Sequence, residues 1–246
     1  MKKINWQISL SVLLVLLSAV LYCCHYLIFK DSHHIFIFLL ADIAFVPIEV
    51  LLVTVIIHQL LDIREKQILL KKMNMVIGTF FSEVGTELLK IMSSFDKVSD
   101  SLHQTLIIKK DCTEKQFKQK LQTVQAYSPE IDIKKRDLVH LNGFLMKHRS
   151  FLLRLLENQN LLEHETFTDL MWAVFHLTEE LETRTDLEHI SHNDMQHLIG
   201  DFQRVYKILI IAWLAYMKHL KADYPFLFSF AMRTNPFDAE ATPEFK

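Results

Sequence analysis

Two long apolar segments open the chain, at residues 4–29 and 35–61. At about 1.5 Å per helical residue, each is long enough to cross a hydrocarbon layer of about 30 Å. The five residues 30–34 between them leave room only for a tight turn, so the two helices must be antiparallel neighbours. The pattern predicts a transmembrane hairpin over residues 1–61. A cleaved signal peptide fits less well, because the first run is too long and no small-residue cleavage site follows it.

The basic residues that flank these segments predict their orientation. Lys2 and Lys3 precede the first segment, and four basic residues follow the second: Arg64, Lys66, Lys71 and Lys72. The turn between them contains a single Lys30. Because cytoplasmic flanks carry the excess of Lys and Arg, we expect an integral protein of the inner (plasma) membrane with both termini in the cytoplasm.

The second apolar segment carries two acidic residues, Asp42 and Glu49. A charge near the bilayer centre costs about 2.5 to 3.5 kcal/mol on insertion scales, so both need polar partners. Residues seven apart share one helix face, and matching the two hairpin ends brings the first segment level with these acids. The polar partners expected there are Ser18, Tyr22 and His25. Two interpretations stay open: a proton or cation path in an oligomer, and polar contacts between helices. We favour the second, because a single hairpin is too small to enclose a path.

From residue 62 onward the apolar positions recur at helical spacing, which predicts an all-α cytoplasmic domain. We expect a charged stalk over 62–73, a helical bundle over 74–235 and a disordered tail over 236–246. Glycine and proline are scarce, at 4 and 5 residues, which argues against a turn-rich β fold.

Capping residues and periodicity place the longer helices of this domain. Asp111, with Glu114 three residues later, predicts the start of a helix that runs to about Tyr127. Two amphipathic helices are expected at 134–157 and 165–184. A last long helix, at about 194–221, has Ser191 or Asn193 as its cap. Its segment 206–220 is short for a third crossing, so we expect it to be a buried core helix.

Composition excludes several classes of function. The four glycines are isolated, so neither a dinucleotide fingerprint nor a phosphate-binding glycine loop exists. The 27 basic and 29 acidic residues nearly balance, so no net positive charge attracts nucleic acid. Three cysteines form no disulfide framework. No arrangement of Ser or Cys with His indicates nucleophilic catalysis, so we expect no enzyme activity and no cofactor.

Histidine is abundant, with 13 residues, and one stretch of it is the best metal candidate. The candidate ligands are His189, His192, His197 and Asp201. His197 and Asp201 are four apart and share a helix face, and imidazole with carboxylate suits zinc or iron. The spacing matches no standard site, however, and the first part of the stretch is typical of a helix start. His176, near Glu179 and Glu180, is a weaker candidate ligand that more often marks a hydrogen-bonded core boundary.

Four stretches together resemble a family of bacterial inner-membrane proteins that have two spans and a helical cytoplasmic domain. They are residues 34–61, 75–89, 161–181 and 219–237, the last of which reads HLKADYPFLFSFAMRTNPF. The resemblance implies this topology, and it implies no activity, cofactor or site residue.

Three functions follow from these patterns as hypotheses. The first is a non-enzymatic membrane protein that acts as an oligomeric scaffold, sensor or docking subunit, with the lipid bilayer, further copies of itself and a cytoplasmic protein as partners. The second is a homo-oligomer that conducts protons or cations through Asp42 and Glu49. The third is a metal-binding sensor or enzyme at the histidine cluster.

Overall fold

The structure is a computed structural model that describes residues 2–97, 99–158, 161, 165–184 and 186–244. These residues form helices and loops, without any strand beyond an isolated bridge between Asp96 and Ile131. The all-α class is therefore confirmed. The chain divides into two compact units, Met1–Lys66 and Gln67–Lys246.

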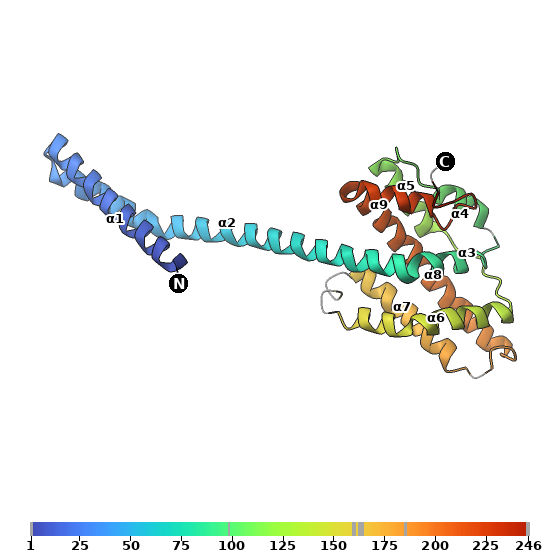
Figure 1. Cartoon of the computed structure of the whole chain (residues 1–246). Coiled ribbons are helices and arrows are strands. Elements are labelled where there is room, and N and C mark those ends of the chain that lie inside the picture. The colour runs from blue at the N-terminus through green and yellow to red at the C-terminus, as the bar shows by residue number, and fades with distance from the viewer. Residues whose placement is uncertain (1, 98, 159–160, 162–164, 185, 245–246) are drawn as a thin grey trace. The chain divides into compact units, whose positions relative to one another are not determined.

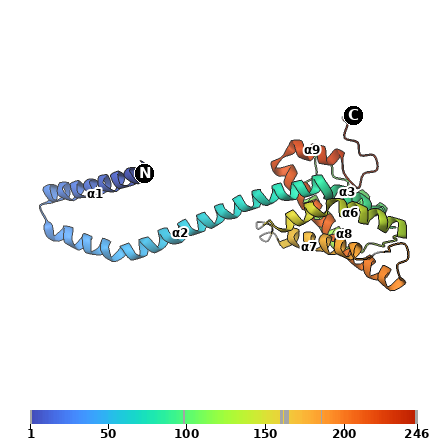
Figure 2. The ribbon, with the colours of Figure 1, turned by 60° about the horizontal axis from the view of Figure 1, so that its bottom comes forward.

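The first unit is a helical hairpin. It consists of α1 (Lys2–Phe29) and the first part of α2 (Ser32–Phe80), and α1 folds back along α2 (Figure 2). The stretches Ile8–Phe29 and Ser32–Lys66 are long and apolar enough to cross a membrane, and their side chains are exposed in the isolated chain. The side chains of Lys2 and Lys3, used to predict the orientation, lie outside the described residues.

The turn of the hairpin is shorter than the sequence suggested. Only Lys30 and Asp31 lie between the helices, because α2 already begins at Ser32. Lys30 has the left-handed backbone conformation that ends many helices, with φ 50°. Asp31 then caps α2, since its Oδ1 accepts hydrogen bonds from the backbone N–H groups of His33 and His34 at 3.0 and 3.2 Å.

The second unit is a helical bundle built around α8 (His192–Asp223), as Figure 1 shows. The other elements are the end of α2, the π-helix η1 (Phe81–Gly85), α3 (Thr86–Ser93), α4 (Ser99–Leu106), α5 (Glu114–Ala126), α6 (Lys135–Leu156), α7 (Glu165–Glu182) and α9 (Pro225–Arg233). Helices α3, α5, α7 and α9 pack directly on α8, and α6 packs on α7. The apolar segment 206–220 is thus the buried centre of the domain, with Tyr206 and Trp213 among its largest buried side chains.

The stretch after residue 73 is not one regular α-helix. It changes to a π-helix at Phe81–Gly85 before α3 begins. A Cβ atom on Gly85 would lie 2.6 Å from the Phe81 ring and 2.7 Å from the Phe80 ring, so only glycine accommodates this pair. At Gly78 a Cβ atom would lie 3.6 Å from the Tyr216 ring, so aromatic rings are the neighbours of both glycines.

One of the two predicted caps is wrong. Helix α5 is capped by Thr113, not by Asp111, because the Thr113 hydroxyl accepts the N–H of Gln116 at 3.3 Å and Gln116 accepts the N–H of Thr113 at 2.7 Å. This reciprocal capping box starts the helix two residues later than predicted. The cap of α8 is Ser191, one of the two expected residues, which accepts the N–H of Asp194.

The tail predicted to be disordered begins with ordered residues. Phe237 is buried and meets the Trp213 ring edge-on at 5.1 Å, and its backbone N–H donates to Asn235 Oδ1 at 3.0 Å. Phe237 stands in a stretch without helical periodicity, so the sequence did not predict this contact. Residues 245 and 246 lie outside the described residues.

Candidate metal centre

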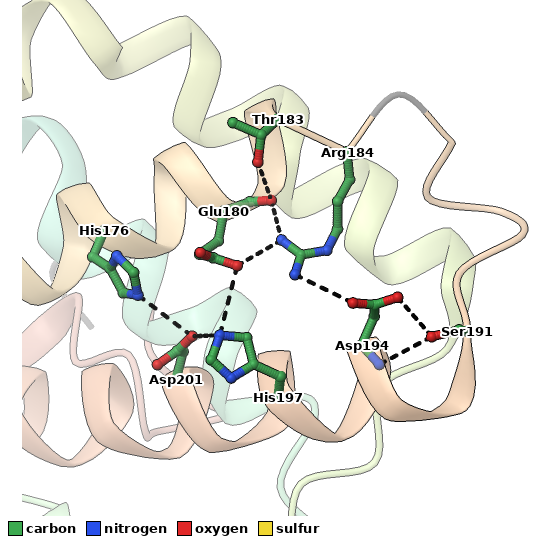
Figure 3. Close-up of polar contacts among 8 residues, drawn as sticks. All are labelled: His176, Glu180, Thr183, Arg184, Ser191, Asp194, His197 and Asp201. Carbon is green, nitrogen blue, oxygen red and sulfur yellow. Dashed lines mark hydrogen bonds and ion pairs between the residues drawn. The ribbon is translucent and has the colours of Figure 1, made fainter.

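Two neighbouring helices each present a histidine and a carboxylate four residues apart. Helix α7 carries His176 and Glu180, and α8 carries His197 and Asp201. Side chains at this spacing project from one helix face, and α7 and α8 pack against each other. His176 consequently lies opposite Asp201, and Glu180 lies opposite His197 (Figure 3).

The distances between these donor atoms are close to those of a metal site. His197 Nε2 lies 3.4 Å and His176 Nε2 lies 3.7 Å from Asp201 Oδ2. One donor atom from each of these three residues lies within 4.8 Å of the others. Ligands at about 2.0 to 2.1 Å from a tetrahedral ion are about 3.3 to 3.4 Å apart. Small rotations of the two half-exposed imidazoles would therefore place all three donors on one ion.

Asp201 is the buried member of the cluster. Its side chain is only 5% exposed, whereas the rings of His176 and His197 are 48% and 57% exposed. In the described part of the chain Asp201 Oδ2 is buried without a hydrogen bond, and Arg204 approaches the other oxygen at 3.5 Å. A buried carboxylate oxygen that lacks a hydrogen bond is costly, so an additional cation at this oxygen would stabilise it.

Glu180 connects the cluster to a second ionic contact. Its Oε2 lies 3.7 Å from His197 Nε2 and 2.7 Å from Arg184 Nη1. The hydrogen bond from Arg184 holds the pKa of Glu180 below its usual value. Arg184 also approaches Asp194, whose carboxylate accepts a 2.6 Å hydrogen bond from Ser191, the cap of α8 (Figure 3). Glu180 is thus a fourth potential ligand for which Arg184 competes.

The ligand set predicted from the sequence is only partly brought together. His197 and Asp201 join the cluster, but His189 does not: its ring is 80% exposed and bonds Asp186 at 2.8 Å. This hydrogen bond lowers the pKa of Asp186. His192 is exposed at the first residue of α8 and is not among the grouped donors. His189 lies in the loop before α8 and His192 lies at the very start of α8, and in the cluster His176 takes their place.

A cavity of about 400 Å³ lies beside the cluster. His176 and Asp201 line it together with Asp169, Trp172, Ala173, Arg204, Val205 and Ile208. The cluster therefore has access from this side for water or a small ligand.

The polar residues predicted in the hairpin also meet. A cavity of about 400 Å³ is lined by Ser18, Leu21, Tyr22, His25, Ile35, Phe38 and Asp42. The Nδ1 atom of His25 is buried without a hydrogen bond in the described residues. Glu49, seven residues after Asp42 in the uninterrupted helix α2, is exposed and does not line this cavity.

The comparisons with known proteins identify a family without an assigned activity. A family model described as the C-terminal helical domain of the uncharacterized protein MJ1433 matches residues 69–233, and the model of its N-terminal helical domain matches residues 2–61. The protein MJ1433 of Methanocaldococcus jannaschii is 45% identical over 234 residues, which cover 95% of this chain and 94% of the relative. No solved structure matches the chain.

The matches agree with the inferred resemblance in its N-terminal and C-terminal helical domains. The matched relative is archaeal, whereas the resemblance pointed to bacterial proteins. Because both helical domains match and the identity extends over nearly the whole of both proteins, the chain belongs to the MJ1433 family.

Proposed function

We propose that this protein is a membrane-anchored metal-binding protein, whose helical domain holds a divalent transition-metal ion between α7 and α8. The observation that carries the proposal is the convergence of His176, His197 and the buried Asp201 within 4.8 Å. A metal at this point would add a cross-link between two helices that already pack against each other. Such a cross-link suits a sensor, because occupancy would stiffen this end of the domain.

The donor set favours zinc or ferrous iron. Two imidazoles and one carboxylate suit these ions, whereas calcium and magnesium prefer oxygen ligands alone. Three protein ligands leave a coordination position for water, for Glu180 or for a small ligand from the adjoining cavity.

The first prediction concerns metal binding by the full chain in nanodiscs. We expect one Zn²⁺ or Co²⁺ per chain, with the visible absorption of tetrahedral Co²⁺. His176→Gln and His197→Gln each remove one ligand and should weaken binding by at least about tenfold. Isothermal titration and Co²⁺ absorption measure the affinity and the geometry.

His189→Gln is the matched control, because it removes an exposed imidazole that bonds Asp186 outside the cluster. It should leave the affinity unchanged. Absence of stoichiometric metal, or an equal loss in His189→Gln, would overturn the assignment.

The anchor in this proposal is the hairpin of α1 and the first part of α2. It is supported by the length and hydropathy of Ile8–Phe29 and Ser32–Lys66. With both termini cytoplasmic, a cysteine at position 32 in a chain otherwise free of cysteine should react with an impermeant maleimide on intact cells. A cysteine at position 188 should react only after permeabilisation. The reverse pattern would contradict the orientation.

The cavity around Asp42 favours conduction as a second candidate function. His25 and Asp42 bring an imidazole and a carboxyl to one cavity in the hairpin. If several copies enclose this cavity, Asp42→Asn should abolish proton or cation flux in liposomes while the helical content is retained. Unchanged flux would remove this candidate.

A further inference from the structure

Another cavity of the second unit is distinct from the metal cluster. It has a volume of about 890 Å³ and is bounded by residues of α2, α5, α7 and α8. Cavities that bind small organic ligands usually enclose about 300 to 1,000 Å³. Its size therefore fits a ligand considerably larger than water.

Apolar side chains make up a large part of the lining of this cavity. The apolar residues that line it are Ile77, Phe117, Leu121, Phe167, Ile211, Ala212, Leu214 and Ala215, of which Ile77, Phe117, Phe167, Ala212 and Leu214 are buried. Tyr216 also lines it and stacks on Phe81, with the ring centroids 4.9 Å apart. Such a wall favours hydrocarbon over a polar ligand.

The mouth of the cavity is basic. Lys115 and Lys118, three residues apart on α5, are both exposed and line the cavity. Within the described part of the chain neither lysine has an ion-pair partner or a side-chain hydrogen bond. A third lysine, Lys218, is neutralised by Glu114, with Nζ and Oε1 2.5 Å apart. Two cations thus remain for a ligand.

We propose that this cavity binds a single-chain amphiphile with an anionic head, its alkyl chain in the apolar interior and its carboxylate or phosphate at Lys115 and Lys118. Charge complementarity selects the anionic head, since both unpaired groups at the mouth are cations. The proposal is independent of metal binding, because none of the cluster residues lines this cavity.

The test is photolabelling of the full chain in nanodiscs made of zwitterionic lipid. The probe is hexadecanoic acid with a diazirine in the middle of its chain, and digestion followed by mass spectrometry locates the adducts. We expect adducts on peptides from α5, α7 and α8. Palmitate or hexadecyl phosphate should compete, and the stronger competitor identifies the head group. Hexadecyltrimethylammonium should not compete.

Two variants with a matched control make the test specific. Lys115→Glu with Lys118→Glu should lower labelling at least about fivefold by reversing the charge at the mouth. Lys134→Glu with Lys135→Glu makes the same change of charge at the start of α6, outside the cavity, and should leave labelling unchanged. Ala215→Trp should block the space for the alkyl chain and lower labelling, although both lysines remain.

The proposal is overturned if adducts are confined to residues 2–66, which would indicate only probe dissolved in the bilayer. Equal competition by the cationic amphiphile would overturn it as well. So would unchanged labelling of Ala215→Trp, or an equal loss in the Lys134 and Lys135 control.

Discussion

At the scale of single residues, Asp201 shows how burial distinguishes a candidate ligand from a surface charge. Its side chain is almost fully buried, and two imidazoles from different helices approach the same oxygen. His189 has the same side chain as His197 and lies eight residues away, yet it only bonds the neighbouring Asp186. The two histidines differ in their distance from a buried carboxylate and from a second imidazole, and the sequence shows neither.

The ion pair of Glu180 and Arg184 gives a pH-dependent prediction. Because the Arg184 hydrogen bond lowers the Glu180 pKa in the folded protein, the pair stabilises the fold above the unfolded pKa of about 4.5 and loses this effect as the pH falls through the folded pKa. Arg184→Gln should cost about 0.5 to 1 kcal/mol at pH 7, or about 1 to 4 °C in Tm.

Thermal unfolding followed by circular dichroism, at pH 7 and at pH 3.5, measures this difference. The gap between Arg184→Gln and the parent protein should narrow at the lower pH. A gap that is independent of pH would mean that Arg184 acts through packing and not through its charge.

At the scale of elements, the π-helix Phe81–Gly85 is the irregular point of the bundle. Phe80, directly before it, meets Phe167 at 5.5 Å, and Phe81, its first residue, stacks on Tyr216. A π-turn inserts one residue and re-aims the side chains that follow it. The packing of several helices therefore depends on a backbone irregularity for which Gly85 leaves space.

Two glycine substitutions test this packing. Gly85→Ala places a methyl group against two phenylalanine rings and should destabilise the domain by about 1 to 3 kcal/mol. Gly143→Ala, in the middle of α6 with nothing within 4 Å of the added atom, should stabilise it by about 0.5 to 1 kcal/mol. Opposite shifts in Tm are the expected result, and a neutral Gly85→Ala would show that the rings move aside.

At the scale of the whole molecule, we expect the protein to be an oligomer if it is anchored in a membrane as proposed. The isolated hairpin exposes apolar side chains along its length, and Asp42 lies in a cavity that a single hairpin does not enclose. Native mass spectrometry after gentle extraction measures the number of copies. A ring of four or more hairpins would supply the wall for conduction, and flux should then also depend on Glu49.

A monomer or simple dimer would contradict the conducting assembly. The carboxyls of Asp42 and Glu49 would then serve as contacts between helices, and Asp42→Asn or Glu49→Gln should alter stability without altering any flux.

Local sequence determined much of this architecture. The two apolar segments, the helical spacing after residue 62 and the Ser191 cap are properties of neighbouring residues, because helix periodicity and capping act over about four positions. The same locality explains the errors. Asp111 and Thr113 both suit a cap, and only the reciprocal bond with Gln116 decided between them.

Tertiary structure alone decided the candidate sites. His176 and Glu180, and likewise His197 and Asp201, are visible in the sequence as pairs four residues apart, but nothing local states that α7 lies against α8 with these faces together. The basic mouth on α5 and the apolar wall from α2, α7 and α8 are likewise brought together only by folding. Contacts between distant segments depend on how whole helix faces pack, and a single sequence records those faces without recording their partners.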